Sequence, residues 1–364
     1  MASQALMAEL KRPSALSAAE RDAWIAFTNA NPALASPYFR LAFAECCEAA
    51  RDDTRVIVAR KGGAIFGFLP LQIGRVSYAR PLAGPLGDVH GVITEGDTEI
   101  DIPSWLNAAG VPLFEFHSAL AIQSCWRPGE AWRDGSWIID LANGYEAFED
   151  DRSAVEPKAF RNIRSRRRRL EADHDVAEFR MDDRRPEVLE TLFAWKSAQY
   201  RRTQVFDVFS VRWARDLITE IARRDDAGFR GIVSSLTIDG ELAAIHAGMA
   251  SETRCHYWFP AYDPAFNKVS PGLLLLLETA RDAADKGLTS VELGPGDYDF
   301  KRNLGGYQIP LSAGCMVTRS PAAALRHAAR ALADTVERAP LGPMKTLPRR
   351  LLRRADKLSA FYAV

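Results

Sequence analysis

The sequence predicts an α/β protein with mixed sheets, and three features lead to this class: a strand hairpin, an apolar helix after it, and an earlier copy of the hairpin layout. Residues 231–238 are rich in β-branched side chains, and residues 241–250 continue as the returning strand. Between them, Asp239-Gly240 supplies the positive φ angles of a two-residue turn. An aromatic strand at 254–262 follows and ends at Asp263-Pro264, a pair that favours a turn.

The first half of the chain repeats the hairpin layout. Residues 54–60 and 64–73 are strand-like segments on either side of Lys61-Gly62-Gly63. Helical segments precede both hairpins, at 18–28 and 37–50 in the first half and at 187–203 and 211–224 in the second. We therefore predict two duplicated units. Chance similarity is the alternative, because two helices followed by a hairpin are a common arrangement.

A helix is predicted to follow the aromatic strand. Ser270 is a plausible N-cap, Pro271 fits the first helical position, and Gly272 lets the backbone approach a ligand. Five leucines at 273–277 form its apolar start, and Gly287 fits the position just after its end. The next strand, at 289–293, leads into Gly-Pro-Gly-Asp-Tyr.

The start of this helix is a candidate phosphate site. Its free N–H groups and the positive end of its dipole favour an anion. Asn267 and Lys268 lie on the preceding loop and could assist, while Ser270, Pro271 and Gly272 would bring backbone close to the ligand. The alternative is plain helix capping, which uses the same residue types.

Length and composition limit the classes of function. A chain of 364 residues with 47% hydrophobic and 26% charged residues fits two globular domains, and no apolar run approaches the roughly 20 residues that span a bilayer. Five cysteines without metal-ligand spacing indicate reduced thiols in the cytoplasm and no metal site. The N-terminus lacks a signal-peptide pattern. A formal charge of zero argues against a DNA-binding protein.

We place the domain boundary in the polar, acidic stretch 143–157, which gives domains at 1–150 and 151–320 and a basic tail at 321–364. The charge reverses at 158–169, a predicted amphipathic helix. Phe160, Ile163 and Leu170 would face the core, and most of the arginines would face solvent.

Three interpretations of the basic helix stay open. In the first, the helix is a solvated face that pairs with the acidic stretch. In the second, residues such as Arg161 and Arg164 bind phosphate groups of substrate or cofactor. In the third, the helix touches an anionic membrane. A second basic stretch at 345–357 has the pattern of a membrane-surface helix, a packed helix or a frayed tail.

The order of these features resembles a known family. It consists of the hairpins, Ser270-Pro271-Gly272, the apolar helix and Glu292-x-Gly294-x-Gly296-Asp297 with Lys301. The family is the GNAT-type acetyltransferase family associated with bacterial cellulose and exopolysaccharide synthesis (CelD/BcsL-like), related in turn to the FemABX transferases. The resemblance covers about 36 to 317. It implies a duplicated GNAT-like fold whose second half binds acetyl-CoA or another acyl-CoA and transfers the acyl group directly, without a nucleophilic serine or cysteine.

Direct transfer needs a base for the acceptor and a proton donor for the thiolate. By resemblance His246 faces the cofactor channel, and strand alternation places it with the small Ala244 and Gly248, so we predict that it is the base. Asp297, Glu292 and Tyr298 are predicted to orient it, replace it or protonate the thiolate. The alternative for a lone strand histidine is a structural role, which we prefer for His256.

Further residues are predicted to contact the acceptor. Lys301 could hold a phosphate or carboxylate. Asp88 and His90 would form a wall contributed by the first half, although exposure on a turn explains them equally well. The chain departs from the family at Glu292, where Asp is usual, and at Phe300, where a tyrosine is expected.

The predicted function is acyl transfer to a hydroxyl or amine of an exopolysaccharide or cell-envelope precursor, either free or lipid-linked, with peripheral contact at the inner membrane through the basic segments. One alternative is a FemABX-like enzyme that uses aminoacyl-tRNA, against which the neutral total charge argues. The other is a non-catalytic subunit of a polysaccharide-synthesis complex.

Overall fold

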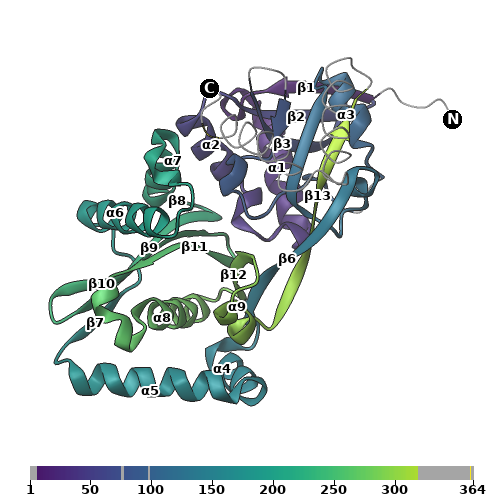
Figure 1. Cartoon of the computed structure of the whole chain (residues 1–364). Coiled ribbons are helices and arrows are strands. Elements are labelled where there is room, and N and C mark those ends of the chain that lie inside the picture. The colour runs from purple at the N-terminus through teal and green to yellow at the C-terminus, as the bar shows by residue number, and fades with distance from the viewer. Residues whose placement is uncertain (1–5, 75–77, 97–98, 319–360, 362–364) are drawn as a thin grey trace, which may run out of the picture. The chain divides into compact units, whose positions relative to one another are not determined.

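The computed structural model describes residues 6–74, 78–96, 99–318 and 361, and Figure 1 shows the course of the chain. The chain forms two compact units. Unit 1 comprises Met1–Asn31, Arg51–Arg133 and Leu311–Val364, and unit 2 comprises Pro32–Ala50 and Asp134–Pro310. The basic stretch predicted at 345–357 lies outside the described residues, as does the tail at 321–364 apart from Phe361.

Unit 1 is built on a sheet with the strand order β1-β2-β3-β4-β5-β13. Its elements are β1 (Leu6–Lys11), α1 (Ala18–Ala30), β2 (Thr54–Lys61), β3 (Ala64–Ile73), β4 (Tyr78–Arg80), α3 (Ile102–Ala108), β5 (Leu113–Leu120) and the second part of β13 (Tyr307–Val317). Trp105, Phe114, Phe116 and Trp126 fill its apolar core. A capping box between Ser17 and Glu20 starts α1.

Unit 2 is built on a sheet with the strand order β6-β12-β11-β10-β9-β7. Its strands are the second part of β6 (Glu130–Asp140), β7 (Ala177–Arg180), β8 (Asp225–Asp226), β9 (Phe229–Ile238), β10 (Glu241–Ala250), β11 (Arg254–Tyr262) and β12 (Ser290–Pro295). Its helices are α2 (Leu41–Ala50), α4 (Gly144–Val155), α5 (Pro157–Asp173), α6 (Pro186–Arg202), α7 (Arg212–Arg223), α8 (Pro271–Asp285) and α9 (Asp299–Leu304). In Figure 1, α6 and α7 lie on one face of this sheet and α8 on the other.

The two sheets repeat one another pair by pair. In unit 1 the pairs β1–β2, β2–β3 and β3–β4 are antiparallel, β4–β5 is parallel and β5–β13 is antiparallel. In unit 2 the pairs β7–β9, β9–β10 and β10–β11 are antiparallel, β11–β12 is parallel and β12–β6 is antiparallel. The strand order therefore confirms the predicted duplication.

Local signals placed the hairpins correctly. Asp239 and Gly240 have φ angles of 50° and 87°, and Gly62 and Gly63 have 59° and 85°, so both hairpins close with two left-handed residues. Gly287, with a φ of 80°, ends α8 as predicted. On α5, Phe160, Ile163 and Leu170 are buried as expected.

The boundary between the units differs from the predicted one. The stretch 143–157 is not a polar linker, because it contains α4, whose Tyr145 and Phe148 are buried in the core of unit 2. Each unit also takes its last strand from the other half of the sequence: β6 follows β5 but pairs with β12, and β13 follows β12 but pairs with β5. Among the described helices, none combines the length and apolar character needed to cross a membrane.

Candidate functional site

The parallel strands of unit 2 separate soon after they meet. β11 and β12 pair only at Arg254 with Ser290, Cys255 with Val291 and His256 with Glu292. Beyond these pairs β12 continues beside β6, and β11 continues beside β10 to Tyr262. In the described ladders, the edge of β11 that turns away from β10 has no strand partner after His256, which leaves backbone groups there for a ligand. The carboxyl ends of parallel strands are the usual ligand position in α/β sheets.

The helix between these strands, α8, has an open N-terminus. Ser270 occupies the cap position with φ 54° and ψ 58°, and its side chain makes no capping hydrogen bond. This left-handed backbone turns the hydroxyl away from the cap role that the sequence predicted. The helix begins at Pro271, which has no N–H. A Cβ built on Gly272 would have Tyr262 Cδ1 as its nearest neighbour, at 3.5 Å, so the backbone here is accessible.

The loop before α8 is held by the basic helix. Asn267 and Lys268 lie in the short 3₁₀ helix Pro264–Val269, and both side chains are exposed. Their carbonyl oxygens accept hydrogen bonds from Arg166 Nη1 of α5. Arg166 thus fixes the course of the loop, while the Asn267 and Lys268 side chains stay available to a ligand at the start of α8.

A buried polar cluster lies where β11 and β12 separate. Glu292 is fully buried and accepts hydrogen bonds from Ser36 Oγ at 2.7 Å and Ser136 Oγ at 3.3 Å. Its Oε2 lies 3.5 Å from His256 Nδ1, and His256 Nε2 lies 3.2 Å from the hydroxyl of Tyr38. Burial alone would raise the pKa of Glu292, but the hydrogen bond and charge of His256 lower it overall. We call Tyr38, His256 and Glu292 the buried relay.

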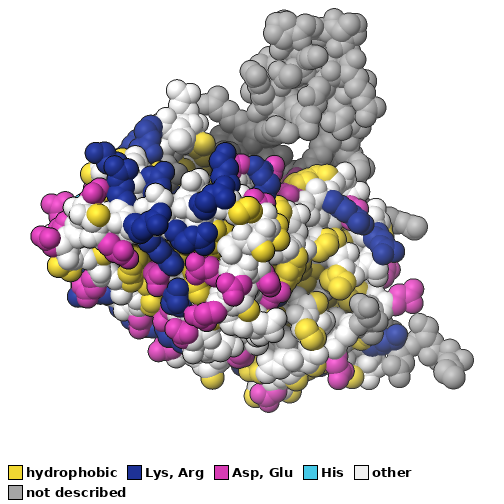
Figure 2. Space-filling model, turned by 90° about the horizontal axis from the view of Figure 1, so that it is seen from below, with side chains coloured by type: hydrophobic (Ala, Val, Ile, Leu, Met, Phe, Trp, Pro, Cys, Tyr) yellow, Lys and Arg dark blue, Asp and Glu magenta, His cyan; other side chains and the backbone are white. Residues whose placement is uncertain are grey.

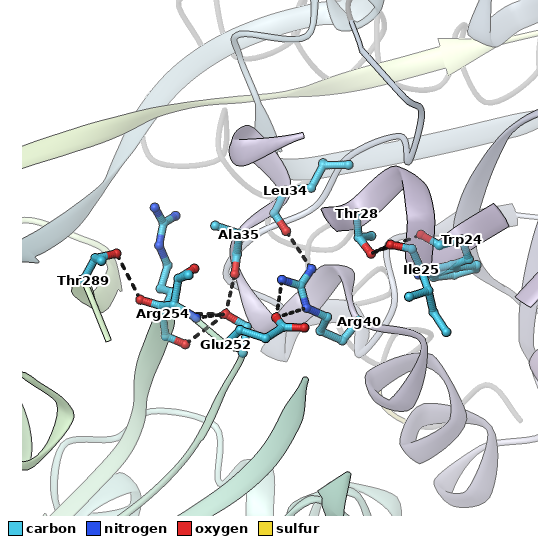
Figure 3. Close-up of polar contacts among 11 residues, drawn as sticks. Trp24, Ile25, Thr28, Leu34, Ala35, Arg40, Glu252, Arg254 and Thr289 are labelled. Atoms are coloured by element: carbon cyan, nitrogen blue, oxygen red, sulfur yellow. Dashed lines mark hydrogen bonds and ion pairs between the residues drawn. The ribbon is translucent and has the colours of Figure 1, made fainter. Parts of the chain in front are cut away.

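The segment that carries Tyr38 is anchored to the β10–β11 turn, as Figure 3 shows around Arg40. Arg40 donates from Nε and Nη2 to Glu252 at 2.9 and 2.7 Å, and from Nη1 to the carbonyl of Leu34 at 3.1 Å. Ser251 Oγ donates to the carbonyl of Ala35 at 2.6 Å. These bonds fix the chain on both sides of Tyr38, whose ring also packs edge-on against His256.

His246, the predicted base, lies in the interior of the protein. It is fully buried, its Nδ1 lies 3.0 Å from Ser234 Oγ, and its ring stacks on Tyr257 at 3.8 Å. Burial and the nearby charge of His256 lower its pKa to about 3, so it is neutral. A Cβ at Gly248 would lie 2.6 Å from His246 Nε2, so that glycine makes room for the imidazole itself. A catalytic role for His246 stays a prediction.

The segment after β12 is tied down by its own residues. Lys301 is buried and donates to the carbonyls of Gly294 at 3.2 Å and Pro295 at 2.7 Å. Asp297 is exposed and pairs with Arg302, and Tyr298 is exposed over 61% of its surface. Lys301 therefore stabilises the end of β12, and among the predicted catalytic residues Asp297 and Tyr298 face solvent whereas Glu292 does not.

None of the remaining predicted residues is a member of the buried relay. Arg161 and Arg164 are exposed on α5. In unit 1, Asp88 is partly buried, whereas His90 is buried against Phe114 and Trp126, and burial lowers its pKa to about 3. A substrate contact by His90 would require that core to open. Within the described residues, no three His, Cys, Asp or Glu side chains gather closely enough to hold a metal ion.

No sequence pattern indicates Tyr38 as a site residue, and the role predicted for His256 is structural, which stays a prediction. Spacing could not join them, because 218 positions separate the two residues. One signal in the sequence could indicate part of the relay. The strands at 254–262 and 289–293 lie on either side of the predicted helix, so they are expected to pair in parallel, and this pairing places His256 opposite Glu292.

Comparison with known proteins agrees with this geometry. Residues 157–302 match the family model described as "Acetyltransferase (GNAT) domain". FemX superposes with a TM-score of 0.54 at 11% identity, over 81% of this chain and 94% of FemX. A conserved protein of unknown function from Bacteroides thetaiotaomicron VPI-5482 superposes with a TM-score of 0.52 at 14% identity, over 85% of this chain and 100% of that one.

A tandem GNAT protein from the clavulanic acid biosynthesis pathway gives a TM-score of 0.49 at 10% identity, over 86% of this chain and 98% of that protein. A comparison with curated proteins gives no match. The family model thus matches residues 157–302, and the two superpositions above 0.5 show that the chain shares its fold with FemX.

Proposed function

We propose that the chain is an acyltransferase that moves an acetyl or other acyl group from acyl-CoA to a hydroxyl or amine of an exopolysaccharide or cell-envelope precursor. The observation that carries the proposal is the separation of β11 from β12 beside the open start of α8. A GNAT domain over these elements supports acyl transfer as the chemistry. The acceptor class rests on the sequence resemblance to the exopolysaccharide-associated family.

The start of α8 fits the phosphates of such a donor. Gly272 exposes backbone with room for a neighbouring group, and the helix dipole favours negative charge. Asn267 and Lys268 add an amide and a cation from the adjoining loop. Acyl-CoA supplies a thioester whose carbonyl carbon the acceptor attacks. Backbone N–H groups of β11 beyond His256, where this strand no longer pairs with β12, would polarise the thioester carbonyl.

The buried relay supplies the proton acceptor. Transfer joins the acyl carbon to the acceptor oxygen or nitrogen, breaks the carbon–sulfur bond and removes one proton from the acceptor. Tyr38 would take that proton while its own passes to His256 Nε2, 3.2 Å away. Glu292 would then stabilise the imidazolium across 3.5 Å. We prefer this relay to His246, because a buried imidazole with a pKa near 3 is a weak base.

Calorimetric titration with acetyl-CoA and with desulfo-CoA tests the donor. We expect saturable binding of both ligands. Gly272→Asp should weaken binding on the order of a hundredfold or more, because its carboxylate would repel the phosphates. The matched control is Gly272→Asn, which has the same size without the charge, and the Cβ of either side chain would meet Tyr262 only at ordinary contact distance, 3.5 Å.

Well-folded protein that binds neither ligand would overturn the proposal. It would leave a donor of the aminoacyl-tRNA type, or a non-catalytic role in a polysaccharide-synthesis complex, as the explanation of the fold. An equal loss of affinity in Gly272→Asp and Gly272→Asn would show that the size of the side chain matters and its charge does not. The phosphates would then not bind at the start of α8.

A further inference from the structure

The basic helix α5 presents far more charge than its packing uses. Between Pro157 and Asp173 the sequence has seven Lys and Arg residues and two carboxylates. Figure 2 views the molecule from the side on which α5 lies and shows Lys and Arg side chains gathered there, with Asp and Glu side chains alongside. The helix is anchored on its other side, where Phe160 and Ile163 join one apolar cluster and Leu170 joins another.

Three of the arginines have structural partners. Arg166 donates to the carbonyls of the loop before α8. Arg167 lies 3.1 Å from Glu278 and 4.0 Å from Glu149, and Arg169 lies 3.1 Å from Asp173. The contacts of Arg166 and Arg167 hold α5 against the rest of unit 2, and the Arg169–Asp173 pair lies within the helix.

The other four cations are Lys158, Arg161, Arg164 and Arg168. They are exposed, and among the described residues none of them has an ion pair or a side-chain hydrogen bond. Their spacing of three, three and four positions places them along one side of the helix. We call them the free stripe. They form a continuous line of positive charge that faces solvent.

Pairing with the acidic stretch at 143–157 does not explain the free stripe. Of the four α4 carboxylates, Glu146 and Glu149 lie 3.4 and 3.9 Å from Arg281 of α8, and Glu149 also reaches Arg167. Among the described residues, the other two, Asp150 and Asp151, form no ion pair with the free stripe. The acidic helix therefore neutralises α8 and the buried side of α5. The acidic stretch at 143–157 therefore does not neutralise the positive charge of the free stripe.

We propose that the free stripe docks the protein on an anionic lipid surface. A row of unpaired arginines on one helix matches a plane of negative headgroups. Exposed apolar side chains lie just beyond both ends of α5, with Val155 62% and Val176 61% exposed. The stripe has no exposed aromatic side chain on which bases would stack, which favours lipid over single-stranded nucleic acid. The inference does not depend on the proposed function, but such docking would bring the site to lipid-linked acceptors.

Vesicle sedimentation of the full chain tests this proposal. Phosphatidylcholine vesicles are compared with vesicles that also contain phosphatidylglycerol, at low and high salt. We expect binding only to the anionic vesicles, and less of it at high salt. Each basic residue near such a surface contributes about fivefold to the partition coefficient, so Arg161→Gln, Arg164→Gln and Arg168→Gln together should reduce it about a hundredfold.

The matched control removes three exposed arginines that already have carboxylate partners, through Arg180→Gln, Arg184→Gln and Arg212→Gln. It makes the same change in net charge and should alter the partition by less than about twofold, since these cations are already compensated. The comparison also isolates α5 from the basic stretch at 345–357, which all three proteins retain.

Equal binding of the stripe variant and the control would overturn the proposal, and so would equal binding to neutral vesicles. If the protein bound tRNA through the free stripe and did not bind vesicles, the stripe would be a nucleic-acid site. This result would also overturn the proposal. Acetyl-CoA titration of the stripe variant and of the control separates the vesicle result from the proposed function. Lost vesicle binding with equal donor binding in the two variants supports the proposal, whereas loss of donor binding in the stripe variant alone would assign Arg161 and Arg164 to the phosphates of the cofactor and overturn it.

Discussion

The two units connect their parallel strands with helices that begin in opposite ways. In unit 1, α3 has seven residues, and the carboxylate of Asp101 accepts from the Ser104 N–H at 3.4 Å and from the Ser104 hydroxyl. In unit 2, α8 has fifteen residues, and Ser270 makes no capping bond. The start of α3 is thus closed by its own negative charge, whereas the start of α8 is open to an anion.

The residues that pair across the parallel strands differ as well. In unit 1 they are Tyr78 with Leu113 and Ala79 with Phe114, whereas in unit 2 they end in His256 with Glu292. One sheet topology therefore carries an apolar core in the first unit and a polar relay in the second. The two units therefore share the arrangement of their strands but differ in the side chains where the parallel strands meet.

The largest expected effect comes from removing the hydroxyl of the relay. Tyr38→Phe should lower the transfer rate on the order of a hundredfold to ten-thousandfold, because the acceptor proton loses its path to His256. Affinity for acetyl-CoA should be unchanged. The check is thiol release from acetyl-CoA with an acceptor that supports turnover, measured across pH.

The matched control is Tyr78→Phe, since Tyr78 is a buried tyrosine at the parallel pair of unit 1. It should leave the transfer rate within about twofold, because a residue outside the site touches no reacting group. A Tyr38→Phe enzyme with the rate and pH profile of the wild type would exclude Tyr38 from proton transfer and return attention to His246.

Glu292→Gln should destabilise unit 2 by about 3 kcal/mol near neutral pH, because the buried carboxylate held by Ser36, Ser136 and His256 loses its charge and one acceptor oxygen becomes an NH2 group. The folded-state pKa of Glu292 is lowered, so its stabilisation is present above the ordinary value of 4.5 and is lost as pH falls through the folded value. Denaturant unfolding at neutral and acid pH measures this, and the two proteins should converge in acid. A constant difference would show that the carboxylate charge contributes nothing.

Much of the fold was readable from local sequence. The hairpins, α6, α7 and α8 follow from turn residues and periodicity, which act over a few positions, and Gly287 marks the end of α8. The exchange of β6 and β13 was not readable, because it depends on pairing between strands far apart in the chain. The helix α4 was missed because its acidic exposed face hid the buried Tyr145 and Phe148.

The candidate site was readable only in part, and for the same reason. Ser270, Pro271 and Gly272 lie together in sequence, so a local pattern marks the start of α8. Glu292 entered through the resemblance. Tyr38 comes to His256 only through tertiary structure, when Arg40 and Ser251 fix its segment beside the β10–β11 turn. Local patterns therefore predict single elements of a site, while the contacts that combine them need the fold.

Unit 1 has a buried carboxylate that serves structure alone, and it sharpens the contrast with Glu292. Glu20 is held by Lys11 Nζ at 2.9 Å and Arg60 Nη2 at 2.7 Å. Burial opposes ionisation, but the hydrogen bonds from Lys11 and Ser17 lower the pKa of Glu20 to about 2. Glu20→Gln should cost about 2 kcal/mol at neutral pH, allowing for screening of the partly exposed cations.

Because the folded pKa of Glu20 is depressed, this stabilisation is present above about 4.5 and disappears as pH falls toward about 2. The measurement is the free energy of unfolding of wild type and variant across that range. Donor binding should be unaffected at every pH where both proteins are folded. A Glu20→Gln protein that loses acetyl-CoA binding while folded would break the division between a structural unit 1 and a functional unit 2.

The smallest expected difference separates the two helix starts themselves. Asp101→Ala should destabilise the protein by about 1 kcal/mol, because the first turn of α3 loses its side-chain acceptor. Ser270→Ala should cost about 0.3 kcal/mol or less, since Ser270 makes no such bond and alanine meets the same strain at a φ of 54°. Denaturant midpoints of the two variants measure both effects. An equal cost at both positions would mean that Ser270 caps α8 after all, and the start of α8 would then be no more open to an anion than that of α3.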